Sequence, residues 1–339
     1  MARAFFAAVP LLLASAVASA CPLCIGTAAR SSSQDLEELP RAVLAMPAGK
    51  EFRVIEVIKG AKPAAMLAEV VVREPAPAGK ALLLVRDDPW PMWVSLGWVS
   101  PRHAGALREL ATEHPQEADL AAWHRRLDVA IPNLESREAL LAEVAYAEAA
   151  GAPYAALRAA KPRLDARALR AFVSDPALAA RLPLYLLLLL GIAGDARDAA
   201  WIEARLTAAW EARNATSLSS LLAADLELRG VSRVAWIEDR YLRDRSRTTA
   251  EIQAALLALS VQANSGGVIP RERVIQAYRL FIREHRDMAG FVAQDLAAWQ
   301  YWDAAPEYAT LLKSNVRLQN DTREAIVAYL RQSPLRWSE

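Results

Sequence analysis

The alternation of apolar and polar residues divides the chain into a short strand-rich region and a longer helical one. Between residues 41 and 100, five segments rich in valine, isoleucine, leucine and tryptophan are separated by turns that contain proline, glycine or aspartate. The five predicted strands are Arg41–Met46, Phe52–Lys59, Leu67–Arg73, Lys80–Arg86 and Met92–Val99. Five short strands in about 60 residues predict a small OB-like barrel or sandwich. Alternation is imperfect in the second segment, which predicts a β-bulge there or a strand buried on both faces.

From residue 118 to the end, apolar positions recur with the spacing of amphipathic helices, and the joints between these helices are short. The clearest predicted helices are Ser136–Ala149, Ala177–Ile192, Ala196–Glu211, Ser217–Arg229, Val231–Arg243, Thr249–Ala263, Arg271–His285, Met288–Trp302, Pro306–Ser314 and Thr322–Arg331. Asp195 and Thr216 stand where helices begin and Gly230 stands where one ends, as capping preferences favour.

Two stretches of the helical region, 187–206 and 223–242, share one pattern. Each runs from a leucine-rich helix through a glycine-containing turn into a helix that carries Ala-Trp-Ile. Trp201 and Trp236 take the same place in this pattern, so we expect them to occupy equivalent buried positions. Recurrence of helix pairs at this spacing predicts a HEAT-like α-solenoid, with an irregular helical bundle as the alternative.

The first 20 residues have the three parts of a secretory signal peptide. Arg3 supplies a positive charge, residues 5–17 are apolar, and residues 18–20 (Ala-Ser-Ala) form a small-x-small cleavage pattern. The apolar stretch is too short to span a membrane. We therefore expect cleavage between Ala20 and Cys21 and an exported protein, located in the periplasm or outside the cell.

These patterns predict a mainly α-helical protein with a small β domain. The predicted parts are a signal peptide (1–20), a small β domain (21–110), a linker (111–117) and a helical-repeat domain (118–339). The second apolar run, 182–193, is also too short to cross a membrane, so no transmembrane segment is expected in the mature chain. Basic and acidic residues are nearly balanced, 40 against 39, which argues against nucleic acid as a partner.

Cys21 and Cys24 form the sharpest local motif and are the two cysteines of the chain. In an oxidising compartment they can close a small disulfide loop, which is the interpretation we favour. Cleavage after Ala20 also places Cys21 at the mature N-terminus, where a lipid anchor is the alternative. Redox activity is a further alternative, although no strand precedes the motif. Metal binding would need more ligands, and the four histidines are scattered, so we predict no metal site.

Other residues that carry chemistry form weaker patterns. His124 and Asp128 share a helical face, but no nucleophile motif accompanies them, so we interpret this face as solvated. Three tryptophans near the last strand offer a stacking surface, and four arginines form a basic run that neighbouring acids partly neutralise. These residues are Trp90, Trp93 and Trp98, and Arg240, Arg243, Arg245 and Arg247. We predict no catalytic residues and no cofactor.

Two resemblances can be stated. The early Cys-x-x-Cys, the segment FRVIEVIKG (52–60) and the later segments AEVVVRE and GKALLLV resemble bacterial netrin-like or TIMP-like OB-fold domains over about 80 residues. Inhibitors of that class begin Cys-x-Cys and pair those cysteines with later ones, which this chain lacks. The whole chain resembles exported bacterial proteins of unassigned activity that begin Cys-Pro-x-Cys and continue into a β-rich and then a helical region. CPLC, AYAEAAGAPY (145–154), LPLYLLLLLGIAGD (182–195) and DLAAWQYWD (295–303) carry this second resemblance.

The expected function is non-enzymatic: binding or scaffolding of another protein of the bacterial envelope, because a solenoid offers an extended surface and no reaction motif is present. The resemblance to netrin-like domains implies protease inhibition as an alternative. A Cys-x-x-Cys thiol redox protein is the third hypothesis.

Overall fold

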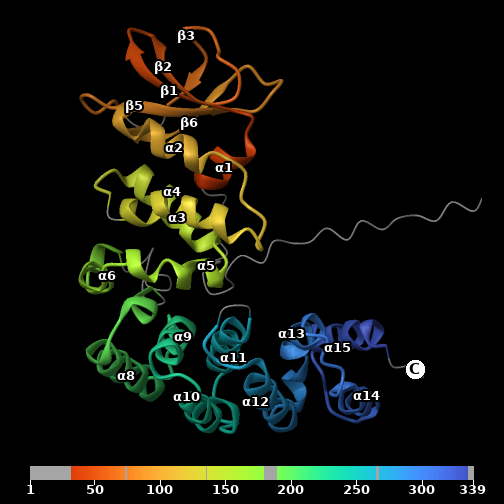
Figure 1. Cartoon of the computed structure of the whole chain (residues 1–339). Helices are drawn as coiled ribbons and strands as arrows, with labels where there is room; N and C mark the ends of the chain where they lie inside the picture. The colour runs from red at the N-terminus through yellow and green to blue at the C-terminus, as the bar shows by residue number, and fades with distance from the viewer. Residues whose placement is uncertain (1–31, 73–74, 135, 179–188, 265–266, 335–339) are drawn as a thin grey trace, which may run out of the picture.

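The computed structural model describes residues 32–72, 75–134, 136–178, 189–264 and 267–334. The protein is mainly helical, with a small sheet of six strands at its N-terminal end (Figure 1). The prediction of a mainly α protein with a small β domain is therefore confirmed. Cys21, Cys24 and the predicted signal peptide lie outside the described residues.

The sheet is nearly closed because one short segment pairs with both of its edges. Its strands are β1 (Arg41–Ala48), β2 (Glu51–Lys59), β3 (Met66–Leu67), β4 (Val70–Val71), β5 (Ala81–Arg86) and β6 (Trp93–Val99), in the order β3-β2-β1-β5-β6-β4. The strand predicted over 67–73 is in fact two: β3 pairs with β2, and β4 pairs in parallel with β6. Only Ala68 and Glu69 separate them, so the chain passes directly from one edge of the sheet to the other.

The two central strands, β1 and β5, are buried on both faces. Val43, Leu82 and Leu84 point into the interior of the barrel-like sheet, together with Trp93 and Trp98. The opposite face of these strands belongs to the core shared with the helices. Double burial explains why both strands are almost continuously apolar.

The predicted irregularity in the second strand is confirmed as a pair of register shifts between β1 and β2. The shifts fall between Ala42 and Val43 and between Leu44 and Ala45, which leaves Ile58 and Ile55 as extra residues on β2. Each is a β-bulge, a feature that bends a strand and increases its twist. Strong local twist helps a small sheet to close on itself.

Helices of six to 14 residues pack beside the sheet and continue the chain away from it. They are α1 (Ser32–Glu38), α2 (Ala104–Leu110), α3 (Leu120–Asn133), α4 (Ala139–Gly151), α5 (Tyr154–Ala159) and α6 (Ala166–Val173). The segment 21–110, predicted as β structure, therefore also contains α1 and α2. Leu36 of α1 and Leu107 of α2 are fully buried in the common core, so these helices belong to the packed structure beside the sheet.

The remaining helices form pairs that follow one another in sequence. They are α8 (Ala196–Glu211) with α9 (Leu218–Arg229), α10 (Ser232–Ile237) with α11 (Thr249–Ala263), α12 (Arg271–Glu284) with α13 (Ala293–Ala298), and α14 (Ala305–Lys313) with α15 (Asn320–Gln332). A π-helical turn, Glu238–Leu242, continues α10, and a 3₁₀ segment, Arg286–Val292, precedes α13. The predicted boundaries agree closely for most of these helices. Most of the predicted helix 177–192 lies outside the described residues.

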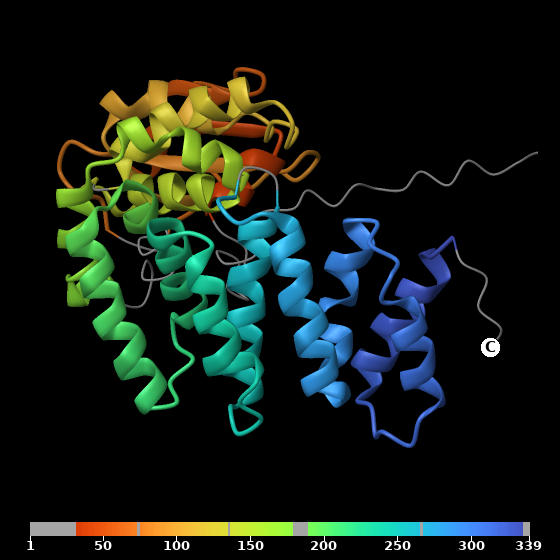
Figure 2. The same cartoon turned by 60° about the horizontal axis from the view of Figure 1, so that its bottom comes forward.

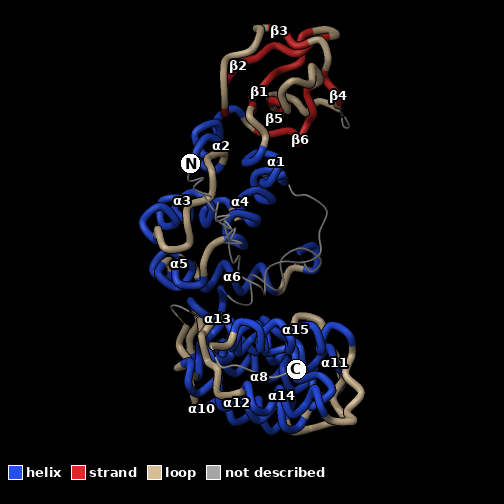
Figure 3. Tube along the Cα trace, turned by 90° about the vertical axis from the view of Figure 1, so that its right-hand side faces the viewer, coloured by secondary structure: helices blue, strands red, loops and turns tan. Residues whose placement is uncertain are grey.

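The pairs stack side by side in two rows (Figure 1), and the turn inside each pair lies along one edge of the stack (Figure 2). Viewed from the side, this stack and the part that carries the sheet lie at opposite ends of the molecule (Figure 3). The helix α9 packs against both α8 and α11, and α15 packs against both α13 and α14. Successive pairs begin 34 to 39 residues apart, close to the spacing of the sequence repeat.

The expectation that Trp201 and Trp236 are buried is wrong, although their positions are equivalent. Both side chains are half-buried, whereas the isoleucines that follow them, Ile202 and Ile237, are fully buried. A turn of 100° per residue places only one of two neighbouring residues toward the core. Each indole instead lies under an arginine, with Arg205 3.6 Å from the ring centre of Trp201 and Arg233 3.8 Å from that of Trp236.

Candidate functional site

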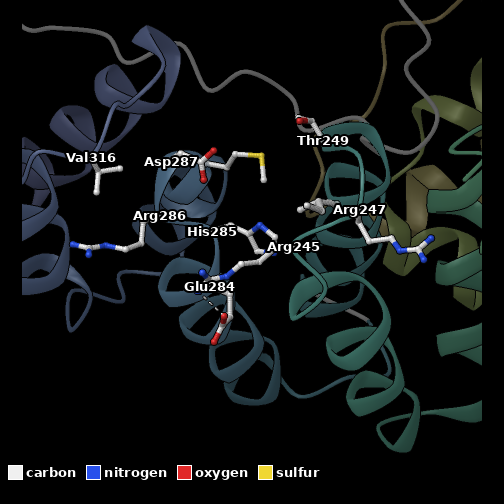
Figure 4. Close-up of a pocket in the computed structure, with 10 residues that line it drawn as sticks. Arg245, Arg247, Thr249, Glu284, His285, Arg286, Asp287 and Val316 are labelled. Carbon is white, nitrogen blue, oxygen red and sulfur yellow. Dashed lines mark hydrogen bonds and ion pairs between the residues drawn. The ribbon is translucent and has the colours of Figure 1, made fainter.

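A groove of 410 Å³ lies on the edge of the helix stack where the turns of three successive pairs meet (Figure 4). One wall comes from Arg245, Arg247 and Thr249, at the start of α11. The other comes from residues 284–288, after α12, and from Val316 between α14 and α15. We call this feature the turn groove. Its volume falls within the range of small-ligand pockets.

The wall at α11 is fixed by hydrogen bonds. The side chain of Arg247 is 6% exposed and forms ion pairs with Asp244 (3.0 Å) and Glu251 (3.1 Å), and it donates to the carbonyl oxygen of Trp210 (2.9 Å). Thr248 and Glu251 form a capping box at the start of α11. The charge of Arg247 is thus fully neutralised by the protein.

The base of the turn groove contains a neutral histidine. His285 is 4% exposed, stacks on Phe281 and lies 3.0 Å from the carbonyl oxygen of Leu242, the last residue of the π-helical turn. Burial lowers the pKa of His285, so the ring is neutral at pH 7 and its Nε2–H donates to Leu242. This bond fixes the orientation of the ring.

The remaining charged residues of the groove are available to a ligand to different degrees. Arg245 is exposed and pairs with Glu284 at 2.9 Å. Arg286 and Asp287 are exposed and form no hydrogen bond or ion pair within the part of the chain that the structure describes. Ile252 and Met288 add buried apolar surface. The arrangement suits binding of a ligand with charges of both signs.

A second exposed feature lies on the barrel-like sheet. Of the eight large apolar residues that are exposed among those described, six belong to this part of the chain. They are Met66, Val71, Val72, Trp90, Met92 and Val94, which we call the barrel patch. Val71 and Val94 are register partners across β4 and β6, so their side chains lie next to each other. Trp90 is the most exposed, at 69%.

One group of charged residues beside the barrel patch, Arg41, Arg86 and Asp88, is joined by ion pairs. Asp88 lies 2.7 Å from Arg41 and 2.9 Å from Arg86, and these contacts hold the pKa of Asp88 below its usual value. Arg86 also lies over the ring of Trp93, 5.1 Å from its centre. The two arginines are therefore held in place by Asp88 and Trp93 at the border of the patch.

A third cluster involves the predicted linker 111–117. His114 lies between two carboxylates, with Nδ1 2.7 Å from Glu37 of α1 and Nε2 3.0 Å from Glu148 of α4. Glu148 is fully buried and also pairs with Arg126 of α3. The imidazole stacks on Trp123 of α3 at 5.5 Å. This segment therefore joins three helices.

The protonation of this cluster follows from its geometry. Burial by itself lowers the pKa of His114, but hydrogen bonds to Glu148 and Glu37 outweigh burial and raise the pKa to about 9. Burial also raises the pKa of each carboxyl, but the contacts with His114 overcome this and hold both pKa values below the usual range. At neutral pH an imidazolium is therefore bound by two carboxylates, which is a structural role.

The tryptophans and the histidine singled out in the sequence are only partly brought together. Trp93 and Trp98 fill the barrel interior and are 2% and 8% exposed, so they cannot stack on a ligand together with Trp90. No contact joins His124 to Asp128 among the described residues: Nε2 of His124 has no hydrogen-bond partner, and Asp128 pairs with Arg163.

The predicted basic run is engaged within the protein. Arg240 lies over the rings of Trp210 and Trp236, Arg243 pairs with Asp239, and Arg245 and Arg247 have the partners given above. Across the described residues, no group of three or more His, Cys, Asp or Glu side chains can hold a metal ion. In the same part of the chain, no helix has the length and apolar character needed to cross a membrane.

Comparison with protein-family models, with curated proteins and with solved structures gave no match to this chain. Of the residues singled out in the sequence, Trp90 belongs to the barrel patch, and Arg245 and Arg247 line the turn groove. Neither surface as a whole was predicted, nor were the unpaired Arg286 and Asp287. The sequence does contain hints of each surface. The turns of the helix pairs recur, which points to the turn groove, and apolar residues stand beside the turns of the β segments, which points to the barrel patch.

Proposed function

We propose that this chain is an exported scaffold that binds another protein of the bacterial envelope through its barrel patch. The observation that carries the proposal is the concentration of exposed apolar side chains on the strands β3, β4 and β6 and the turn before β6, among which Trp90 is the most exposed. Apolar patches of this kind mark interaction surfaces, and tryptophan and methionine are enriched in the cores of protein interfaces. The partner surface that fits is apolar, because the exposed side chains of the patch are apolar.

The helix pairs support the scaffolding part of the proposal. We propose that α8 to α15 form a HEAT-like solenoid, because pairs of similar length stack in sequence order and each packs mainly on its neighbours. Hydrogen bonds attach this stack to the rest of the fold: Tyr154 of α5 donates to Glu227 of α9 (2.7 Å) and accepts from Gln262 of α11 (2.6 Å). Such a connection would hold the barrel patch and the helix stack in a fixed relation.

The test is affinity capture from the envelope fraction with the full mature chain. The wild type is compared with a Trp90→Ser, Met92→Ser double variant, and Val231→Ser is the matched control because Val231 is also exposed (49%) but lies outside the sheet. Circular dichroism establishes that all three proteins are folded. We expect one major partner with the wild type and the control, and its loss with the double variant.

Equal capture by the double variant would contradict the proposal. Sedimentation with protein-free vesicles of phosphatidylcholine and phosphatidylglycerol provides the second arm. If the wild type binds these vesicles and the double variant does not, the barrel patch is a membrane-binding surface and the protein-binding proposal is wrong.

A further inference from the structure

We propose that the turn groove is a second binding site, and that its ligand is a short peptide segment in which an acidic and a basic side chain flank an apolar one. This site is separate from the barrel patch and does not depend on it. The proposal follows from the size of the groove, the placement of its unpaired charges and the rigidity of its walls.

The dimensions of the turn groove fit a short peptide. It has a volume of 410 Å³, and its walls come from the turns of three successive helix pairs (Figure 4). An extended segment can therefore contact several turns at once. Stacked repeats in general build extended binding surfaces from neighbouring units.

Charge complementarity defines the side chains of the ligand. Arg286 and Asp287 lie next to each other on one wall, are exposed, and have no partner within the described residues. A ligand that is purely anionic would face Asp287 and Glu284, and a purely cationic one would face Arg286 and Arg245. A segment with one charge of each sign satisfies both unpaired groups without placing like charges together.

The apolar part of the ligand has a matching surface. Ile252 and Met288 line the groove and are 1% and 7% exposed, and Val316 adds a half-buried side chain at its far side. A leucine-sized side chain placed here would be removed from water against these groups. His285 is held neutral and in one orientation, so it adds no charge that would upset the balance.

The walls of the groove are ordered before any ligand binds. Arg247 is fixed by three partners, and the capping box at Thr248 fixes the start of α11. The intervening turn is held by Ser246, which hydrogen-bonds to Asp244 and accepts from Arg213. These groups do not have to be ordered on binding, so the loss of conformational entropy falls mainly on the side chains of Arg286 and Asp287.

The experiment is isothermal titration calorimetry of the full mature chain with acetylated and amidated tripeptides. The probes are Glu-Leu-Lys and Lys-Leu-Glu, and Gln-Leu-Gln is the uncharged comparison. We expect one of the charged peptides to bind at least tenfold more tightly than the uncharged one. An Arg286→Ala, Asp287→Ala variant should lose at least tenfold in affinity, which corresponds to about 1.4 kcal/mol.

A matched control and a charge exchange make the result specific. Glu272→Ala with Arg279→Ala removes one exposed charge of each sign from α12 outside the groove and should leave affinity unchanged. Arg286→Asp with Asp287→Arg should shift the preference to the peptide of reversed order. Absence of binding by the wild type up to millimolar peptide, or equal affinity for all three peptides, would overturn the proposal. Neither result affects the capture experiment on the barrel patch.

Discussion

Replacement of His114 by glutamine should remove a pH-dependent part of the stability of this protein. Glutamine keeps hydrogen-bonding capacity close to that of the imidazole but carries no charge at any pH. In the wild type the pKa of His114 is raised from 6.5 to about 9 through its hydrogen bonds to Glu148 and Glu37, which outweigh the opposing effect of burial. The protonated form is therefore bound more tightly in the folded state than in the unfolded one.

The sign and size of the effect on the free energy of unfolding follow from the coupling between protonation of His114 and folding. A folded-state pKa above the unfolded value contributes stability that is complete below pH 6.5 and is lost as the pH rises through 9. In an unscreened site this shift corresponds to about 3 kcal/mol. About a third of the His114 side chain (32%) is exposed, so solvent screening reduces the contribution to about 1–2 kcal/mol.

The assay is urea unfolding of the wild type and of His114→Gln at pH 6, 7.5, 9 and 10. We expect the wild type to be more stable than the variant by about 1–2 kcal/mol at pH 6, and the difference to vanish by pH 10. His124→Gln is the matched control, because His124 has no carboxylate partner and its substitution should not produce this pH dependence. A difference between wild type and His114→Gln that is the same at pH 6 and pH 10 would show that the imidazolium is not held by the two carboxylates.

Four further predictions test other parts of the structure. Tyr154→Phe leaves two buried polar partners without their shared hydroxyl and should cost about 1–3 kcal/mol in chemical denaturation. Trp236→Ala should cost about 2 kcal/mol, less than the 3–5 expected for a fully buried tryptophan, since this side chain is half-buried; a cost above 4 would contradict the observed packing. Intact mass of the exported protein should match residues 21–339, with or without a lipid on Cys21, and recovery of the uncleaved chain would refute export. Replacing Cys21 and Cys24 by serine should change stability by less than about 1–2 kcal/mol, because a disulfide would close a very short loop. Reduction of insulin disulfides by the wild type would favour the redox alternative instead.

Helices and strands whose ends are marked by nearby residues were predictable from the sequence. The helices α8, α9 and α11 begin and end within one residue of their predicted bounds, since residues that favour helix ends, such as Asp195, Thr248 and Gly230, stand at those bounds. The strands β1, β2, β5 and β6 were located because turn residues separate their apolar segments. Short helices such as α1 were missed because seven residues contain too little periodicity to be recognised.

The candidate sites were less predictable, because each depends on residues that are distant in sequence. Nothing near His114 in the chain reveals that Glu37 and Glu148 will flank it. Likewise, nothing in the sequence near Arg286 and Asp287 distinguishes them from ordinary surface charges. Only the fold places the turns that contain Thr249 and Val316 beside them.

The sequence by itself therefore determined the composition of this protein in strands and helices, the recurrence of its helix pairs and the spacing between them. Only the tertiary structure decided how the segment 66–71 closes the sheet, how far each tryptophan is buried, and which charges remain unpaired. The physical reason is the range of the interactions. Helix caps, turns and side-chain periodicity act over a few residues, whereas burial and ion pairing depend on which distant segments come into contact.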